Sequence, residues 1–169
     1  MVTRRQFLQV GAGGAAVLAL ARLGHARTAP RTAAPLGAGA REVLAAVVPV
    51  ILDGALPAAP AARAARVAAT IERIGQTVAG LPPHLRAEIG ELFALLAFAP
   101  SRWLIAGVRA PWREASMEEI AAFLTRWRQS GWSLLRQGYL ALHELVLAAH
   151  YGDAASWRAI GYPGPPSLG

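Results

Sequence analysis

Two histidines on one predicted helix are the first candidates for chemistry in this sequence. His143 and His150 lie seven residues apart, so a helix places them on nearly the same face, with Glu144 beside the first. Imidazole and carboxylate groups could hold a metal ion or a non-covalent haem. However, a two-histidine zinc site uses an i, i+4 spacing, and metal sites usually have three or four protein ligands. We therefore expect no metal site and interpret both histidines as packing or surface residues.

A second candidate combines a hydroxyl group with two carboxylates in the run Ser116-Met117-Glu118-Glu119. Neighbouring residues on a helix point in different directions, so Glu118 and Glu119 make a poor acid and base pair. The spacing matches a capping box, in which the serine oxygen accepts a backbone N–H and Glu119 reaches back to the cap. No histidine follows in a triad-like pattern. We expect no catalytic and no cofactor-binding residue in this chain.

Tryptophan beside arginine is a third pattern, and it indicates an interaction surface. The chain has five tryptophans, and arginine adjoins Trp103, Trp112 and Trp127 among them. Both residue types are enriched at interface hot spots, and five tryptophans are hard to bury in one small domain. The candidate partner interface consists of Trp103, Trp112, Trp157, Tyr162 and Pro163.

Composition narrows the class of protein. With 169 residues, 54% of them hydrophobic and 16% charged, the chain fits one folded domain and not a disordered one. Its net charge is +7, and all 17 basic residues are arginine. These arginines are interpreted as spread among acidic residues, so we expect no nucleic-acid partner. The absence of cysteine excludes disulfides, cysteine-ligated iron–sulfur clusters and covalent haem attachment.

Helical periodicity runs through the body of the chain. Apolar stripes predict helices from Arg41 to Asp53, from Pro60 to Gly80, from Leu85 to Pro100, and from Ser116 to Gly152 with a kink or break at Ser130-Gly131. Pro49 is expected to kink or end the first helix, and Ser101 to cap a short helix before Pro111. No strand-like alternation is found in the sequence. We predict an all-α fold, a small bundle of about five to six helices.

The N-terminus resembles a twin-arginine export signal. Arg4, Arg5, Phe7 and Leu8 match the pattern Ser/Thr-Arg-Arg-x-Phe-Leu-Lys, and a mildly apolar run follows that is too short for a comfortable membrane span. Small residues precede a plausible cleavage site after residue 26. We predict a signal peptide over 1–26, a linker over 27–40 and a helical domain over 41–169, with the twin-arginine translocase as a partner. A leader that stays attached as an inner-membrane tether and an amphipathic helix of the domain are alternatives.

The C-terminus adds a resemblance to a known family. From Tyr151 to Pro166 the sequence combines Trp157 and Tyr162 with an extended Gly/Pro tail. Together with the leader and the run 50–54, this ending resembles the small subunit of membrane-associated gluconate 2-dehydrogenase. The resemblance implies an accessory role in the periplasm. A partner flavoprotein would hold FAD and oxidise the substrate, and a multihaem cytochrome c would pass the electrons on.

Two functions of different kinds follow for this chain. The first is a non-catalytic small subunit and export escort of a periplasmic FAD-dependent dehydrogenase. The second is a stand-alone periplasmic or membrane-tethered helical binding protein. A helical enzyme or haem protein is a third and weaker alternative. A ligand pocket between helices would favour the second.

Overall fold

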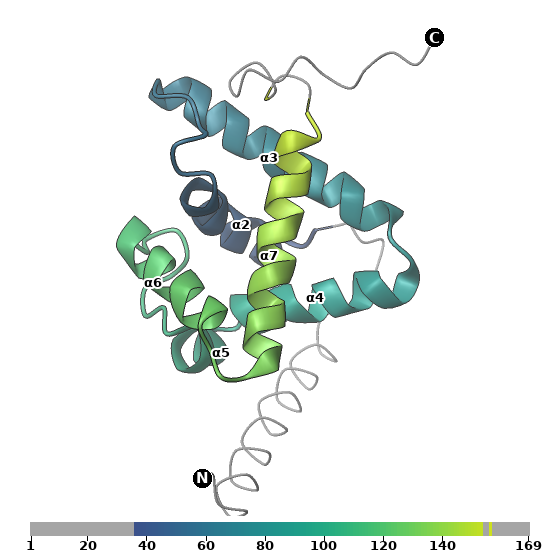
Figure 1. The fold of residues 1–169 in the computed structure, drawn as a ribbon, viewed down its shortest axis with the longest axis vertical. Helices are drawn as coiled ribbons and strands as arrows, with labels where there is room; N and C mark the ends of the chain where they lie inside the picture. Colours follow the sequence, from purple (N-terminus) through teal and green to yellow (C-terminus); the bar gives the residue numbers. More distant parts are fainter. Residues whose placement is uncertain (1–35, 154–155, 157–169) are drawn as a thin grey trace, which may run out of the picture.

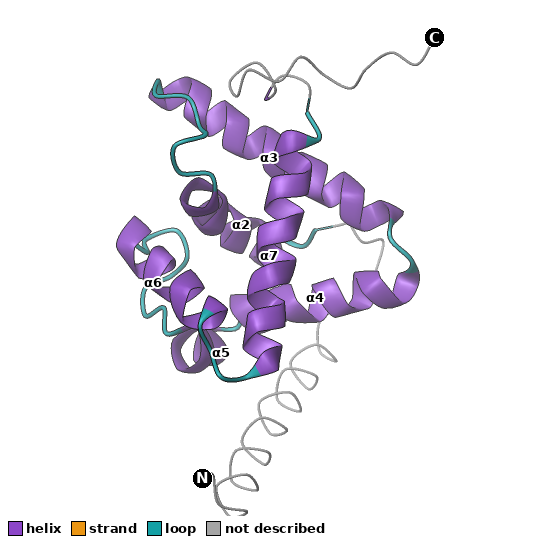
Figure 2. Cartoon of the chain, in the orientation of Figure 1, coloured by secondary structure: helices purple, strands orange, loops and turns teal. Residues whose placement is uncertain are grey.

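All regular secondary structure in the described part of the chain is helical (Figure 2). The structure is a computed structural model, and it describes residues 36–153 and 156. These residues form six α-helices and one π-helical turn, with no strand among them, which confirms the predicted all-α fold. The elements are α2 (Ala38–Ile51), α3 (Pro60–Gly80), α4 (Pro83–Ala97), α5 (Ala99–Ser101), the π-helical turn η1 (Arg102–Ala106), α6 (Met117–Arg128) and α7 (Ser133–Tyr151).

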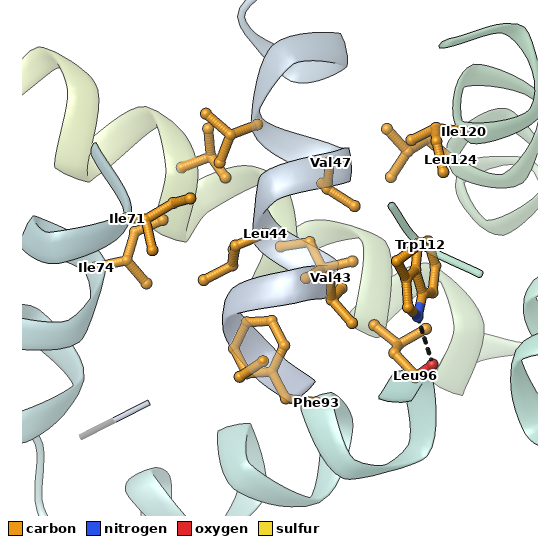
Figure 3. Packing of buried hydrophobic residues seen from close by; sticks show 14 of the residues in the cluster. Val43, Leu44, Val47, Ile71, Ile74, Phe93, Leu96, Trp112, Ile120 and Leu124 are labelled. Carbon is orange, nitrogen blue, oxygen red and sulfur yellow. Dashed lines mark hydrogen bonds between the residues drawn. The ribbon is translucent and has the colours of Figure 1, made fainter. Parts of the chain in front are cut away.

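Helix α2 is the centre of the core. Its two apolar pairs, Val43-Leu44 and Val47-Val48, are fully buried, because α3, α4, α6 and α7 all pack around it. Figure 3 shows Val43, Leu44 and Val47 between two pairs of side chains, Ile71 and Ile74 of α3 on one side and Ile120 and Leu124 of α6 on the other. Burying each Val or Leu side chain contributes about 1.5–3 kcal/mol. Helix α2 alone therefore supplies much of the driving force for folding.

The boundaries of α2 differ from the sequence prediction. The helix begins at Ala38, inside the predicted linker, and it continues past Pro49 to Ile51. Of the two alternatives expected at Pro49, a kink or an early end, the early end is wrong. Proline lacks the N–H that would bond to the carbonyl four residues earlier, and here only the last turn of the helix bears that loss. The packing of Val47 and Val48 on the opposite face keeps the turn helical.

Helices α3 and α7 cross each other over α2 (Figure 1). Pro60 occupies the first turn of α3, where its missing N–H is not needed, and the helix ends at Gly80, as predicted. The stripe on α3 is confirmed at its centre, where Ile71, Ile74 and Val78 are buried. Helix α7 packs on α3 and buries its own Leu142 and Val146 in the core. The two long helices thus enclose one side of the core.

Helix α4 leads directly into a tight corner. A short helical segment follows Ser101, as predicted, in the form of η1. The predicted cap is wrong, because the Ser101 hydroxyl donates to the carbonyls of Leu95 and Phe98 and does not accept an N–H at a helix start. The chain instead continues from α5 into the wider turn η1. Gly107 ends this turn with a φ of 65°, a left-handed conformation that favours glycine.

Helix α6 begins with half of the predicted capping box. The Ser116 hydroxyl accepts the Glu119 N–H at 3.2 Å, as predicted. The Glu119 carboxylate does not return to the cap, because its Oε1 accepts the backbone N–H of Arg109 at 2.6 Å. A hydrogen bond with Ser116 holds the pKa of the Glu118 carboxyl below its ordinary value. The hydroxyl and carboxylates of this run therefore start a helix and fasten the preceding loop.

Candidate functional site

The predicted interface residue Trp112 belongs to the core. It is only 3% exposed, it lies edge-on to Phe123, and its indole Nε1 donates to the carbonyl of Leu96 at 2.8 Å (Figure 3). That carbonyl lies in the last turn of α4, where helical acceptors lack a donor. Placing Trp112 on an exposed partner surface was therefore wrong. Its indole fills the core and satisfies a backbone group that burial would otherwise leave unpaired.

Trp103 lies on the surface together with three further large apolar side chains. They come from η1 and from the start of α7, and we call this group the apolar end: Trp103, 56% exposed; Leu104, 65%; Trp132, 58%; and Leu134, 66%. Figure 1 shows the α5–η1 corner and the loop that joins α6 to α7 at the same end of the molecule. Large exposed apolar side chains that gather at one end of a domain are candidates for an interaction site.

Two hydrogen bonds hold η1 against the last turn of α6. The indole Nε1 of Trp127 donates to the carbonyl of Ile105 at 3.1 Å, and the Arg126 guanidinium donates to the carbonyl of Ala106. A π-helical turn is rare and often occurs at functional sites. Its carbonyls are here bound by side chains of a neighbouring helix. The backbone that carries Trp103 and Leu104 is thereby fixed in place.

Gly138 of α7 completes this arrangement. A Cβ added at Gly138 would lie 2.5 Å from the Trp127 ring, so only glycine lets α7 approach the buried indole this closely. The ring of Phe123 packs edge-on against Trp127, with centroids 4.9 Å apart. The indole of Trp127 therefore connects η1, α6 and α7. The two segments that carry the apolar end, η1 and the start of α7, are thus linked through the Trp127 indole.

A polar cluster lies at the other end of α7. Arg66 and Arg73 of α3 both contact Asp153 Oδ2, at 2.7 and 3.0 Å. Thr70, one helical turn from each arginine, is buried and donates to the carbonyl of Arg66 at 2.9 Å. His150 is 4% exposed and lies in the same region. These polar residues thus fasten the C-terminal end of α7 to α3.

The two histidines differ in environment. Burial, followed by the nearby Arg66 charge, lowers the pKa of His150, and Asp153 opposes this shift in part. The Nδ1 atom of His150 is buried and has no hydrogen-bond partner among the described residues. His143 is partly exposed, stacks at a tilt on Tyr139 and has its Nδ1 4.0 Å from Glu144 Oε1. Within residues 36–153 and 156, no group of three His, Asp or Glu residues is arranged to hold a metal ion.

A small groove lies between α2 and the start of α6. It has a volume of about 400 Å³ and is lined by Ala45, Ala46, Pro49, Trp112, Arg113, Ala115, Met117 and Ile120. The lining is mostly apolar, and the one charged group, the Arg113 guanidinium, is paired with Glu42. Such a groove suits a small apolar ligand more than an anion.

The remaining predicted site residues lie outside the described part of the chain. They are Arg4, Arg5, Phe7 and Leu8, which were predicted to form an export signal, and Trp157, Tyr162 and Pro163 of the predicted interface. Sequence reasoning did not place Leu104, Trp132 and Leu134 in the interface. Leu134 could have been found, since it falls outside the stripe that Leu135 starts. Among the described residues no single helix is long and apolar enough to cross a membrane; by length and composition alone one pair could, Pro83–Ala97 with Ala99–Ala106, bent by 77°.

Comparison with known proteins finds no relative of this chain. No family model matches the chain, and no curated protein and no solved structure matches it either. Its function must therefore be inferred from its own residues.

Proposed function

We propose that this chain is a non-catalytic small subunit that escorts a periplasmic FAD-dependent dehydrogenase through the twin-arginine translocase. The resemblance of its leader and tail to the gluconate 2-dehydrogenase small subunit supports this proposal. FAD would reside in the large flavoprotein, and haem c in a cytochrome that accepts its electrons. In this proposal, oxidation of a sugar or alcohol takes place on the partner.

The apolar end is the observation that carries the proposal. Its side chains are more than half exposed, yet each belongs to a type that contributes about 1.5–3 kcal/mol when buried. Tryptophan at the centre of a contact is a common hot spot. The hydrogen bonds that hold η1 against α6 fix the backbone of Trp103, which lowers the entropy lost on binding. These properties suit a surface that a partner protein covers in the assembled complex.

Co-purification from the native host tests this function. The chain would carry a C-terminal affinity tag, and the periplasmic and membrane fractions would be examined for a stoichiometric second chain with the absorbance of FAD. Replacing Trp103 by Asp should abolish recovery of that chain, whereas Leu85→Gln, at the start of α4, should not. Replacing Arg4 and Arg5 by Lys should leave both proteins in the cytoplasm. A colourless protein that never brings down a flavoprotein would contradict the proposal.

The groove between α2 and α6 favours a second function, a stand-alone helical binding protein of the periplasm. Its volume of about 400 Å³ could hold a small apolar molecule beside Trp112. Trp112 fluorescence would report such binding, although the other tryptophans must be replaced by Phe or accounted for by difference. A ligand that changes this signal, together with a monomer that forms no flavoprotein complex, would establish this function in place of the first.

A further inference from the structure

The segments that carry the apolar end contain arginine but no carboxylate. Residues 92–113 and 120–143 include no Asp or Glu. They include six arginines: Arg102, Arg109, Arg113, Arg126, Arg128 and Arg136. Arg113 is the one of the six that forms a salt bridge among the described residues. Between these two segments, residues 114–119 hold Glu114, Glu118 and Glu119, so the excess of arginine is confined to the segments that carry the apolar end.

Two of these arginines are held in fixed orientations. Arg126 donates to the carbonyl of Ala106, and Arg136 Nη1 donates to the carbonyl of Ser130 at 2.5 Å. A guanidinium has five N–H donors, so each side chain keeps several donors for a further contact. A guanidinium that is already oriented loses less side-chain entropy on binding a carboxylate than one that rotates freely, and its planar N–H donors match the two carboxylate oxygens.

This fixed geometry favours a protein partner over a lipid surface. Headgroups in a fluid bilayer move to meet a cation, so membrane binding gains little from oriented guanidinium groups. The exposed apolar residues also come from a corner and a helix start, and not from one long amphipathic helix lying in a membrane plane. A protein surface can present carboxylates at fixed positions around a pocket for Trp103.

We infer that the apolar end docks into an apolar pocket that is rimmed by carboxylates on the partner protein. This inference rests on the proposed function, because the acidic rim would belong to the flavoprotein. Trp103 and Leu104 enter the pocket, and Arg128 and Arg136 meet the rim. The charges guide the encounter and set its orientation, while the apolar side chains hold the complex together.

The test measures how salt and charge affect the purified complex. The tagged chain with its FAD-containing partner is immobilised, and partner retention is followed by FAD absorbance as NaCl rises from about 20 to about 500 mM, across the range in which surface charges become screened. Arg128→Glu with Arg136→Glu should weaken retention at low salt by about tenfold or more. The wild-type complex should lose partner as salt rises.

Arg86→Glu is the matched control. Arg86 is exposed and donates to the carbonyl of Leu81 at 3.0 Å, much as Arg136 donates to that of Ser130, but it lies at the start of α4. It should leave retention unchanged. Circular dichroism and the thermal midpoint verify that each variant is folded, and Arg128→Gln, which has no hydrogen bond to lose among the described residues, should show a smaller effect in the same direction.

Each outcome bears on the inference. If the complex forms and the Arg128/Arg136 variant behaves like Arg86→Glu, the acidic rim is overturned while the proposed function stands. If no FAD-containing chain is recovered with the wild type, both are overturned. The lone protein is then mixed with vesicles of phosphatidylcholine alone or with phosphatidylglycerol. Binding only to the anionic vesicles, weakened by Arg128→Glu with Arg136→Glu, would assign the apolar end to a lipid surface.

Discussion

Arginine serves opposite purposes at the two ends of α7. At the C-terminal end, Arg66 and Arg73 share the carboxylate of Asp153, so their charge is balanced inside the domain. At the N-terminal end, Arg126 and Arg136 donate to backbone carbonyls and keep their net charge. The first end also buries its neighbours, whereas the second exposes Trp and Leu. The domain thus separates a region that stabilises the fold from a region with the character of a binding surface.

The largest expected effect comes from the residue that joins the two halves of the apolar end. Trp127→Ala should destabilise the domain by about 3–5 kcal/mol, as large-to-small changes of buried aromatics do. It also removes the hydrogen bond to Ile105 that fixes η1. Urea unfolding followed by circular dichroism measures the change. A loss of less than about 1 kcal/mol would mean that η1 is not held by this indole.

The polar cluster should show the next largest effect. Asp153→Asn leaves Arg66 and Arg73 close together without their shared carboxylate. Breaking a buried pair costs about 3–5 kcal/mol, and partial exposure of both arginines reduces the expected loss to about 2 kcal/mol. Asp53→Asn is the control, since its side chain is 72% exposed and lies 3.8 Å from Arg63. Equal unfolding free energies for the two variants would contradict a stabilising role of the cluster.

His150 should make the stability of the same end depend on pH. Its pKa in the folded state lies below the ordinary value of 6.5, so the unfolded chain binds the proton more readily. The histidine has no effect well above pH 6.5. As pH falls through 6.5, the free energy of unfolding should decrease by up to about 1.4 kcal/mol per pH unit.

The histidine controls separate this effect from general acid destabilisation. Replacing His150 by Phe should flatten the pH dependence just below pH 6.5. His143→Gln is the matched variant, since His143 lies on the same helix and is partly exposed. An identical slope in all three proteins, measured by thermal unfolding at several pH values, would assign the dependence to other groups.

The smallest effect on stability is expected at the apolar end itself. Trp132→Ala is the matched partner of Trp127→Ala, because it removes the same side chain from an exposed position. It should change the free energy of unfolding by no more than about 0.5 kcal/mol. The same variant should weaken recovery of the flavoprotein. A large loss of stability would place Trp132 in the support of the fold and not in recognition.

The long helices could be predicted from the sequence because their signals are local. Pro60 at the start of α3, Gly80 at its end and the apolar spacing between them agree on one element. The same agreement holds for Ser116 at the start of α6 and Gly152 after α7. Each of these features depends on one residue and its own turn of helix, so tertiary contacts are not needed to read them.

The apolar end could be predicted only in part, because contacts between residues far apart in the sequence decide which side chains are buried and which are exposed. Trp103 and Trp112 both adjoin an arginine, yet one is exposed and the other buried. The difference lies in the carbonyl of Leu96, which only Trp112 reaches. In the same way, η1 depends on Trp127 and Arg126, which lie about 20 residues further along the chain. No local pattern in residues 102–106 contains that information.

The π-helical turn also has a consequence for how this surface could vary between proteins. A π-helical turn accommodates about one residue more than an α-helical turn, so removing a single residue can restore an α-helix. Because each residue of an α-helix advances the direction of the side chains by about 100°, that deletion would rotate Trp103 and Leu104 around the axis of the segment. Insertion or deletion of one residue within 102–106 would therefore change the direction in which the docking side chains point, while the helices of the core keep their packing.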